Sequence, residues 1–252
     1  MKVSFVIPAY NEEKMIGKCL ASVFDEINRS RTSLAPFEAE VVVVDNASTD
    51  RTREEALKFA VVTVVRENLK GLVYARRAGW VATVGDIVAN IDADTMLPEG
   101  WLQKVMSEFQ KDKNLVALSG PYLYYDIPVW KRTLVKIFYF LGWLIHLVNH
   151  HVLHVGAMVQ GGNFVLRRAA WDSVGGFDTT ISFYGEDTDV AKRIGAVGKV
   201  KWTWRLPMYT TGRRLDKEGL VRMSWLYTVN HLSILWTGRP ATKHYLDVRI
   251  DP

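Results

Sequence analysis

The chain has 252 residues, of which 48% are hydrophobic and 23% charged, and this excludes a disulfide-stapled miniprotein, an intrinsically disordered chain and a polytopic membrane protein. The formal net charge is +5, and residues 201–250 hold nine Lys or Arg against three Asp or Glu, so we expect an anionic partner such as a nucleotide, a nucleic acid or an anionic membrane. The single cysteine, Cys19, cannot form an internal disulfide, and residues 1–8 do not resemble a secretory signal, so we expect a cytoplasmic location.

The first 120 residues alternate short β-branched runs with amphipathic segments, a pattern typical of a parallel sheet covered by helices. Residues 3–8 and 41–44 predict two buried strands, and the apolar residues between 16 and 27 recur at helical spacing. We expect Asn11 to cap that first helix, with Glu12 and Glu13 in its first turn. Asp50 is expected to cap the helix after the second strand.

Three more strands are expected at residues 61–65, 87–91 and 115–119, with helices over residues 71–83 and after Pro98. The same pattern returns after residue 161, with a strand at 163–166 and a helix at 186–195. We therefore expect one continuous α/β domain, with a single Rossmann-like, mostly parallel sheet and helices on both of its faces.

The segment between residues 121 and 159 is aromatic, weakly basic and rich in histidine. Its apolar stretch, residues 137–148, is too short to cross a bilayer, and three interpretations stay open: contact with a membrane surface, packing under the sheet, or a homodimer face. His146, His150 and His154 recur every four residues, which would suit zinc. No cysteine or carboxylate completes such a set, so we favour an interfacial or acceptor-facing role for them.

Polar residues follow three of the predicted strands: residues 8–12, Asp45 with Asn46, and Asp92 with Asp94. Ligands of open α/β sheets bind at the carboxyl ends of the strands, so these clusters predict a site. Two neighbouring carboxylates repel one another unless a cation lies beside them, and Mg²⁺ or Mn²⁺ held in this way completes its shell with diphosphate oxygens. Neither a dinucleotide fingerprint nor a P-loop is present in the sequence.

Four blocks of sequence carry a family resemblance. VIPAYNEE at residues 6–13, VVVDNASTD at 42–50, DAD at 92–94, and GGFD through GEDTD at 175–189 resemble the family 2 glycosyltransferases of the inverting GT-A type. The resemblance implies the GT-A fold, a nucleotide diphosphosugar donor, a divalent cation, either Mg²⁺ or Mn²⁺, and inversion at the anomeric carbon. A UDP-sugar is the favoured donor, with GDP-mannose as the alternative.

The resemblance also implies roles for individual residues. Asp187 is expected to be the general base and Asp94 the metal ligand. Contacts with the nucleotide are expected from Pro8, Ala9, Tyr10, Glu12, Asp45, Arg76, Asp92 and Ala93. Asn163 and Glu186 are expected near the donor sugar and acceptor, and Arg213 or Arg214 is expected to clamp the diphosphate.

This interpretation divides the domain into three regions. Residues 1–120 are the expected nucleotide-sugar-binding half, 121–160 an aromatic insertion for the acceptor, a membrane or an oligomer, and 161–252 the acceptor and catalytic half with a basic tail. The acceptor is expected to be a hydroxyl compound, either a glycan or a polyprenyl-linked molecule, with no nucleic acid partner. Peripheral contact with the cytoplasmic membrane face and a homodimer remain open.

Two other functions are compatible with the composition. A sugar-phosphate nucleotidyltransferase also uses an open sheet with a metal-bound aspartate, but generally has a basic, glycine-rich loop after the first strand, where this chain has the acidic segment PAYNEE. A non-enzymatic adaptor would use the basic tail to bind a membrane or a nucleic acid.

Overall fold

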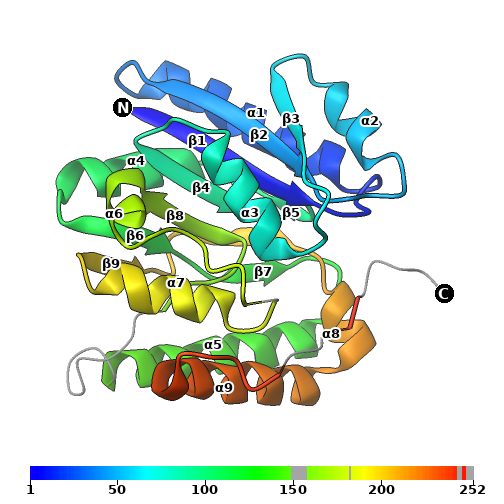
Figure 1. Ribbon diagram of the computed structural model, residues 1–252, viewed down its shortest axis with the longest axis vertical. Helices are drawn as coiled ribbons and strands as arrows, with labels where there is room; N and C mark the ends of the chain where they lie inside the picture. The colour runs from blue at the N-terminus through cyan, green and yellow to red at the C-terminus, as the bar shows by residue number, and fades with distance from the viewer. Residues whose placement is uncertain (149–157, 182, 243–245, 248–252) are drawn as a thin grey trace.

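The computed structural model describes residues 1–148, 158–181, 183–242 and 246–247. Seven of its strands form one sheet in the order β3-β2-β1-β4-β8-β6-β9 (Figure 1). In that order the strands are Val62–Arg66, Glu38–Asp45, Lys2–Ala9, Ile87–Ile91, Asn163–Arg167, Leu115–Ser119 and Lys199–Trp202. The predicted α/β architecture with a mostly parallel sheet is confirmed.

Strand β8 is the antiparallel member of this sheet and pairs with β4 on one side and β6 on the other. A strand from the C-terminal part of the chain therefore lies between two strands of the N-terminal part. A second, three-stranded sheet, which we did not predict, joins β5 (Thr95–Met96), β10 (Met208–Thr210) and β7 (Tyr122–Tyr124). Its strands have only two or three residues, too few to produce a periodic pattern in the sequence.

Helices cover both faces of the large sheet (Figure 1). Helices α1 (Ile16–Ser33) and α4 (Trp101–Lys111) pack against one face, and α3 (Leu72–Val81), α6 (Arg168–Ser173) and α7 (Glu186–Gly195) against the other. Helix α2 (Thr52–Leu57) packs beside α1 and β3. The strands between these two layers are buried on both faces, and burial of one valine side chain stabilises the fold by roughly 1.5–3 kcal/mol.

The first helix begins later than expected. It starts at Ile16, its N-cap position is Met15, and its first turn holds no acidic residue. The predicted capping role of Asn11 is therefore wrong, as is the placement of Glu12 and Glu13 in that turn. Asn11 instead has a left-handed backbone with φ 51°, and its side-chain oxygen accepts the N–H of Thr49 at 2.9 Å.

Asp50 accepts a hydrogen bond of 2.9 Å from the N–H of Thr52, the first residue of α2. The predicted cap of this helix is therefore present as a contact, although the residue at the N-cap position is Arg51.

Three further helices form the part of the molecule farthest from β3. They are α5 (Val129–Val148), α8 (Arg213–Glu218) and α9 (Leu220–Thr237), and α5 and α9 run together along the lower edge in Figure 1. No helix in the described part of the chain combines the length and the apolar character needed to span a bilayer. His150 and His154 lie outside the described residues, as does the side chain of His146, so the proposed histidine set falls outside this description.

Candidate functional site

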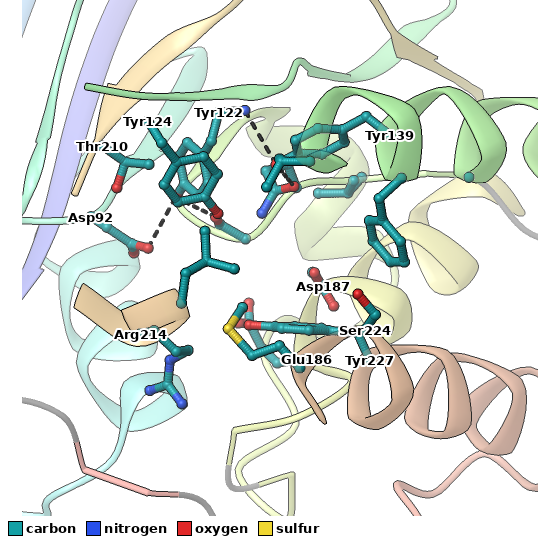
Figure 2. A pocket seen from close by; sticks show the side chains of 18 of the residues that line it. Asp92, Tyr122, Tyr124, Tyr139, Glu186, Asp187, Thr210, Arg214, Ser224 and Tyr227 are labelled. Atoms are coloured by element: carbon teal, nitrogen blue, oxygen red, sulfur yellow. Dashed lines mark hydrogen bonds between the residues drawn. The ribbon is translucent and has the colours of Figure 1, made fainter. Parts of the chain in front are cut away.

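A cavity of about 280 Å³ lies beyond the carboxyl end of β4. It is lined by residues of α3, the loop after β4, β7, α5, the turn before β8, the start of α7, α8 and α9. Seven of the predicted site residues line it: Arg76, Asp92, Asp94, Glu186, Asp187, Arg213 and Arg214. Figure 2 shows Asp92 at one side of this cavity, and Glu186 and Asp187 at another.

Arg76 joins the two groups of acids. Its side chain is almost completely buried, with an exposed fraction of 1%, and its guanidinium forms ion pairs with Asp92 at 3.2 Å and with Glu186. Burial raises the pKa of Glu186 to about 7, although the positive charge of Arg76 acts in the opposite direction. Arg76 therefore fixes the position of Asp92 relative to the start of α7.

The other oxygen of Asp92 contacts Tyr122. The Tyr122 hydroxyl lies 3.1 Å from Asp92 Oδ2 and also contacts the carbonyl oxygen of Gly161. Gly162, the next residue, has φ +76°, and a Cβ atom there would overlap the Asp92 carboxylate. Only glycine therefore fits this turn without displacing Asp92.

Asp94 belongs to a second ionic cluster. Its Oδ2 atom lies 2.8 Å from the guanidinium of Arg213 and accepts a hydrogen bond from Thr211 at 3.1 Å. The same guanidinium lies 2.7 Å from Glu12, which follows β1. Arg213 thus connects the loop after β1 with the loop after β4, and these acids raise the pKa of its guanidinium above the ordinary value.

Asp187 differs from the other acids of the cavity. It is the second residue of α7, whose N-cap residue Gly185 has φ +85°. It forms no ion pair with a lysine or arginine of the described residues. Its Oδ1 atom accepts the N–H of Thr188 at 2.8 Å. Burial raises the pKa of Asp187, whereas this hydrogen bond and the nearby His231 and Arg76 lower it. A raised pKa makes a carboxylate a better proton acceptor.

The residues expected to contact the nucleoside lie at the same edge of the sheet but outside the cavity lining. The register pairs Ala9 with Asp45, so the ends of β1 and β2 are adjacent. Asp45 is buried and accepts the N–H of Ser48 at 3.1 Å, and Lys70 lies 3.9 Å above the ring of Tyr10. Pro8 and Ala93 are buried in and beside the sheet.

Asn163 does not face the cavity. Its side chain is fully buried, donates to the carbonyl oxygens of Gly120 and Leu206, and accepts from the indole of Trp101. These contacts hold the end of β8 against its neighbours, and the side chain is not part of the cavity lining where a sugar contact was expected. Arg214 lines the cavity, where it pairs with Glu218 and lies over the ring of Phe183.

Sequence reasoning missed several residues of the site: Tyr122, Tyr139, Gly162, Thr188, Thr211, Tyr227 and His231. Gly162 and Thr188 are adjacent in sequence to the predicted residues Asn163 and Asp187, and Thr211 is two residues from Arg213, so proximity in sequence is an available signal for these three. Nothing in the sequence links Tyr122 or His231 to the acids they lie near.

The carboxylates of Asp92 and Asp94 are oxygen donors of the kind that a hard divalent cation prefers, and both face the cavity. No group of three acidic, histidine or cysteine side chains that could hold a metal exists among the described residues. The donor set therefore fits a cation that takes the rest of its shell from a ligand's phosphate oxygens and water.

The structure is thus an α/β protein whose cavity, at the carboxyl end of β4, is lined by acidic and arginine side chains. The family described as Glycosyl transferase family 2 matches residues 4–175, so this chain belongs to that family, as its motifs predicted. Among curated relatives, a dolichyl-phosphate beta-glucosyltransferase of Trichomonas vaginalis is 30% identical over 155 residues, which cover 58% of this chain and 47% of the relative. A dolichol-phosphate mannosyltransferase of Pyrococcus furiosus is 34% identical over 127 residues, covering 49% and 34%. The chain thus spans about half the length of these relatives or less.

Solved structures confirm the predicted GT-A fold. The mannosyltransferase PcManGT from Pyrobaculum calidifontis, in complex with GDP-Man and Mn²⁺, aligns with a TM-score of 0.65 and 21% identity over 91% of this chain and 61% of that chain. Glucosyl-3-phosphoglycerate synthase from Mycobacterium tuberculosis, in complex with Mn²⁺ and UDP-glucose, aligns with a TM-score of 0.63 and 21% identity over 96% of this chain and 80% of that chain.

Proposed function

We propose that this protein is an inverting glycosyltransferase that moves a sugar from a nucleotide diphosphosugar to an acceptor hydroxyl. The observation that carries the proposal is the difference between Asp187 and the acids that share its cavity. Asp92 and Asp94 are held by arginines, whereas Asp187 is partly buried and has no such partner among the described residues. It is therefore the acid best suited to accept a proton.

In the proposed reaction, the acceptor oxygen bonds to the anomeric carbon as its proton passes to Asp187. The bond between that carbon and the diphosphate breaks on the opposite side, which inverts the configuration. A base of this kind contributes about 10²- to 10⁴-fold to the rate.

We assign the donor to the edge of the sheet formed by the ends of β1, β2 and β4. Asp94, with Asp92 beside it, would hold Mg²⁺ or Mn²⁺ at the diphosphate, and the cation would offset the charge on the departing nucleotide. Arg213 lies 2.8 Å from Asp94, and its guanidinium would meet the diphosphate beside the cation. The nucleoside would lie toward Tyr10 and Asp45. Mn²⁺ complexes of two structural neighbours, one with UDP-glucose and one with GDP-Man, support this class of donor.

We assign the acceptor to the apolar end of the cavity, where it is lined by α5 and α9. This lining consists of Phe138 and Tyr139 of α5 and Met223 and Tyr227 of α9, together with Met158, which precedes β8. Large apolar side chains of the same two helices are exposed, Trp130 of α5 by 62%, and Trp225 and Trp236 of α9 by 69% and 83%. A lipid-linked acceptor at the cytoplasmic membrane surface fits this arrangement, and the names of the dolichyl-phosphate relatives support a lipid-linked class. A homodimer through the same surface would be the alternative.

Product analysis tests the proposal. The protein is incubated with UDP-sugars or GDP-mannose, Mn²⁺ and membrane lipid extract, and we expect release of a nucleoside diphosphate. Incubation with a sugar phosphate and a nucleoside triphosphate separates the rival activity, because a nucleotidyltransferase would release pyrophosphate. Vesicle or oligonucleotide binding without any cation-dependent nucleotide affinity would support an adaptor instead.

A further inference from the structure

Helix α9 packs directly on the start of α7, where Asp187 lies. A Cβ atom on Gly185 would collide with the side chain of Ile234, so the two helices approach as closely as glycine permits. About two turns further along α7, the ammonium group of Lys192 donates to the carbonyl oxygen of Ile234 at 3.2 Å. These contacts fix the turn of α9 around residue 231 beside the proposed base.

Thr188 and His231 form a path of polar atoms that leads away from Asp187. The Thr188 Oγ1 atom lies 3.5 Å from Asp187 Oδ1 and 3.2 Å from His231 Nδ1. The side chain of Thr188 is buried, whereas the imidazole of His231 is half-buried and therefore partly accessible to water. A hydroxyl can accept one proton and donate another. Thr188 lies between Asp187 and His231, so its hydroxyl can pass a proton from the carboxyl group to the imidazole.

Burial brings the pKa values at the two ends of this path closer together, which allows a proton to pass between them. Burial raises the pKa of Asp187 and lowers the pKa of His231, while the negative charge of Asp187 acts to raise the latter. On α7, Glu186 is directed to Arg76 and the Lys192 ammonium to Ile234. Helix α9 carries no Asp, Glu, Lys or Arg between residues 223 and 237.

We propose that Thr188 and His231 are positioning residues that return Asp187 to its carboxylate form after each sugar transfer by carrying its proton away. This inference rests on the proposed function. The acceptor proton, once on Asp187 Oδ1, passes to Thr188 Oγ1 as the hydroxyl gives its own proton to His231 Nδ1. Asp187 is then a carboxylate, Thr188 a hydroxyl and His231 an imidazolium, which loses one proton to water. The C-terminal helix is thereby part of the catalytic cycle.

Two variants test this relay. Thr188→Val keeps the shape of the side chain but removes its hydroxyl, and His231→Asn keeps a polar atom near the position of Nδ1 but cannot take up a proton. For both, we expect a first turnover close to that of the wild type. The steady-state rate should be roughly 10-fold lower. This loss is smaller than the contribution of about 10²- to 10⁴-fold from a general base, because Asp187 itself is still present. Thr188→Ser should restore the steady-state rate.

The measurement is rapid-quench detection of nucleoside diphosphate, which separates the first turnover from later ones. Thr228→Val, on the exposed side of α9, is the matched control and should change neither phase. Unchanged steady-state rates for both relay variants, or parallel losses in both phases, would overturn the relay. Full activity of Asp187→Asn, or absence of nucleoside diphosphate release by the wild type, would instead overturn the proposed function itself.

Discussion

At the scale of single residues, the candidate site depends on small geometric requirements. Arg76 ties Asp92 to Glu186, residues separated by more than 90 positions, and Gly162 leaves just enough room for the Asp92 carboxylate. The acids and Arg76 could be selected from the sequence because they stand in recognisable blocks. Their pairing could not, because it depends on how the strands are ordered in the sheet.

Gly162→Ala tests this close approach. The left-handed backbone and the overlap with Asp92 should together lower the free energy of unfolding by about 2 kcal/mol or more. Because Asp92 must move, affinity for a nucleoside diphosphate with Mn²⁺ should also fall. Urea denaturation and calorimetric titration measure the two effects.

Gly17→Ala is the matched control, because a Cβ atom at that position in α1 meets nothing within 4 Å. Its stability should stay equal or rise by up to about 1 kcal/mol, the helix-propensity difference between the two residues. Equal effects of the two substitutions would contradict the assigned role of Gly162.

At the scale of elements, the sequence predicted best where its periodicity was strongest. The buried strands and the buried stripe of α1 were found because apolar residues recur at the spacing of one face or fill a whole strand. The antiparallel direction of β8 could not be predicted, because a short run of apolar residues has the same hydrophobic pattern in a parallel and in an antiparallel strand. The start of α1 was misplaced because Asn11 adopts a left-handed backbone and bonds to the next loop.

Helices α5 and α9 carry a prediction of their own. If their outer surface meets a membrane, the protein should bind vesicles of mixed zwitterionic and anionic phospholipid, because exposed tryptophans favour the interface and basic residues favour anionic headgroups. Replacing both Trp225 and Trp236 with Ser should weaken binding in a vesicle flotation assay.

Val81→Ser removes an equally exposed apolar side chain from α3, away from these helices, and serves as the control. Binding that is equally reduced by both sets of substitutions, or a wild-type protein that forms dimers and ignores vesicles, would contradict membrane contact.

At the scale of the whole molecule, burial of the acids makes stability depend on pH. The folded-state pKa of Glu186 is raised from 4.5 to about 7, so between these values the native state keeps a proton that the unfolded chain releases. The raised pKa of Glu186 therefore contributes to the free energy of unfolding below pH 4.5, and this contribution is lost as the pH rises through 7.

Glu186→Gln should reduce this loss of stability across the same interval, as measured by urea denaturation at successive pH values. Glu54→Gln, a substitution at an exposed position of α2, should not change the slope of the free energy of unfolding against pH. If Glu186→Gln keeps the wild-type slope, Glu186 does not titrate in this window.

The most direct test of the account compares wild-type protein with Asp187→Asn under single-turnover conditions. We predict that the first-turnover release of nucleoside diphosphate falls by about 10²-fold or more, because the substituted amide cannot accept the acceptor's proton. The dissociation constant for the nucleoside diphosphate with Mn²⁺ should remain that of the wild type. A first-turnover rate equal to that of the wild type would contradict the assignment of Asp187 as the base.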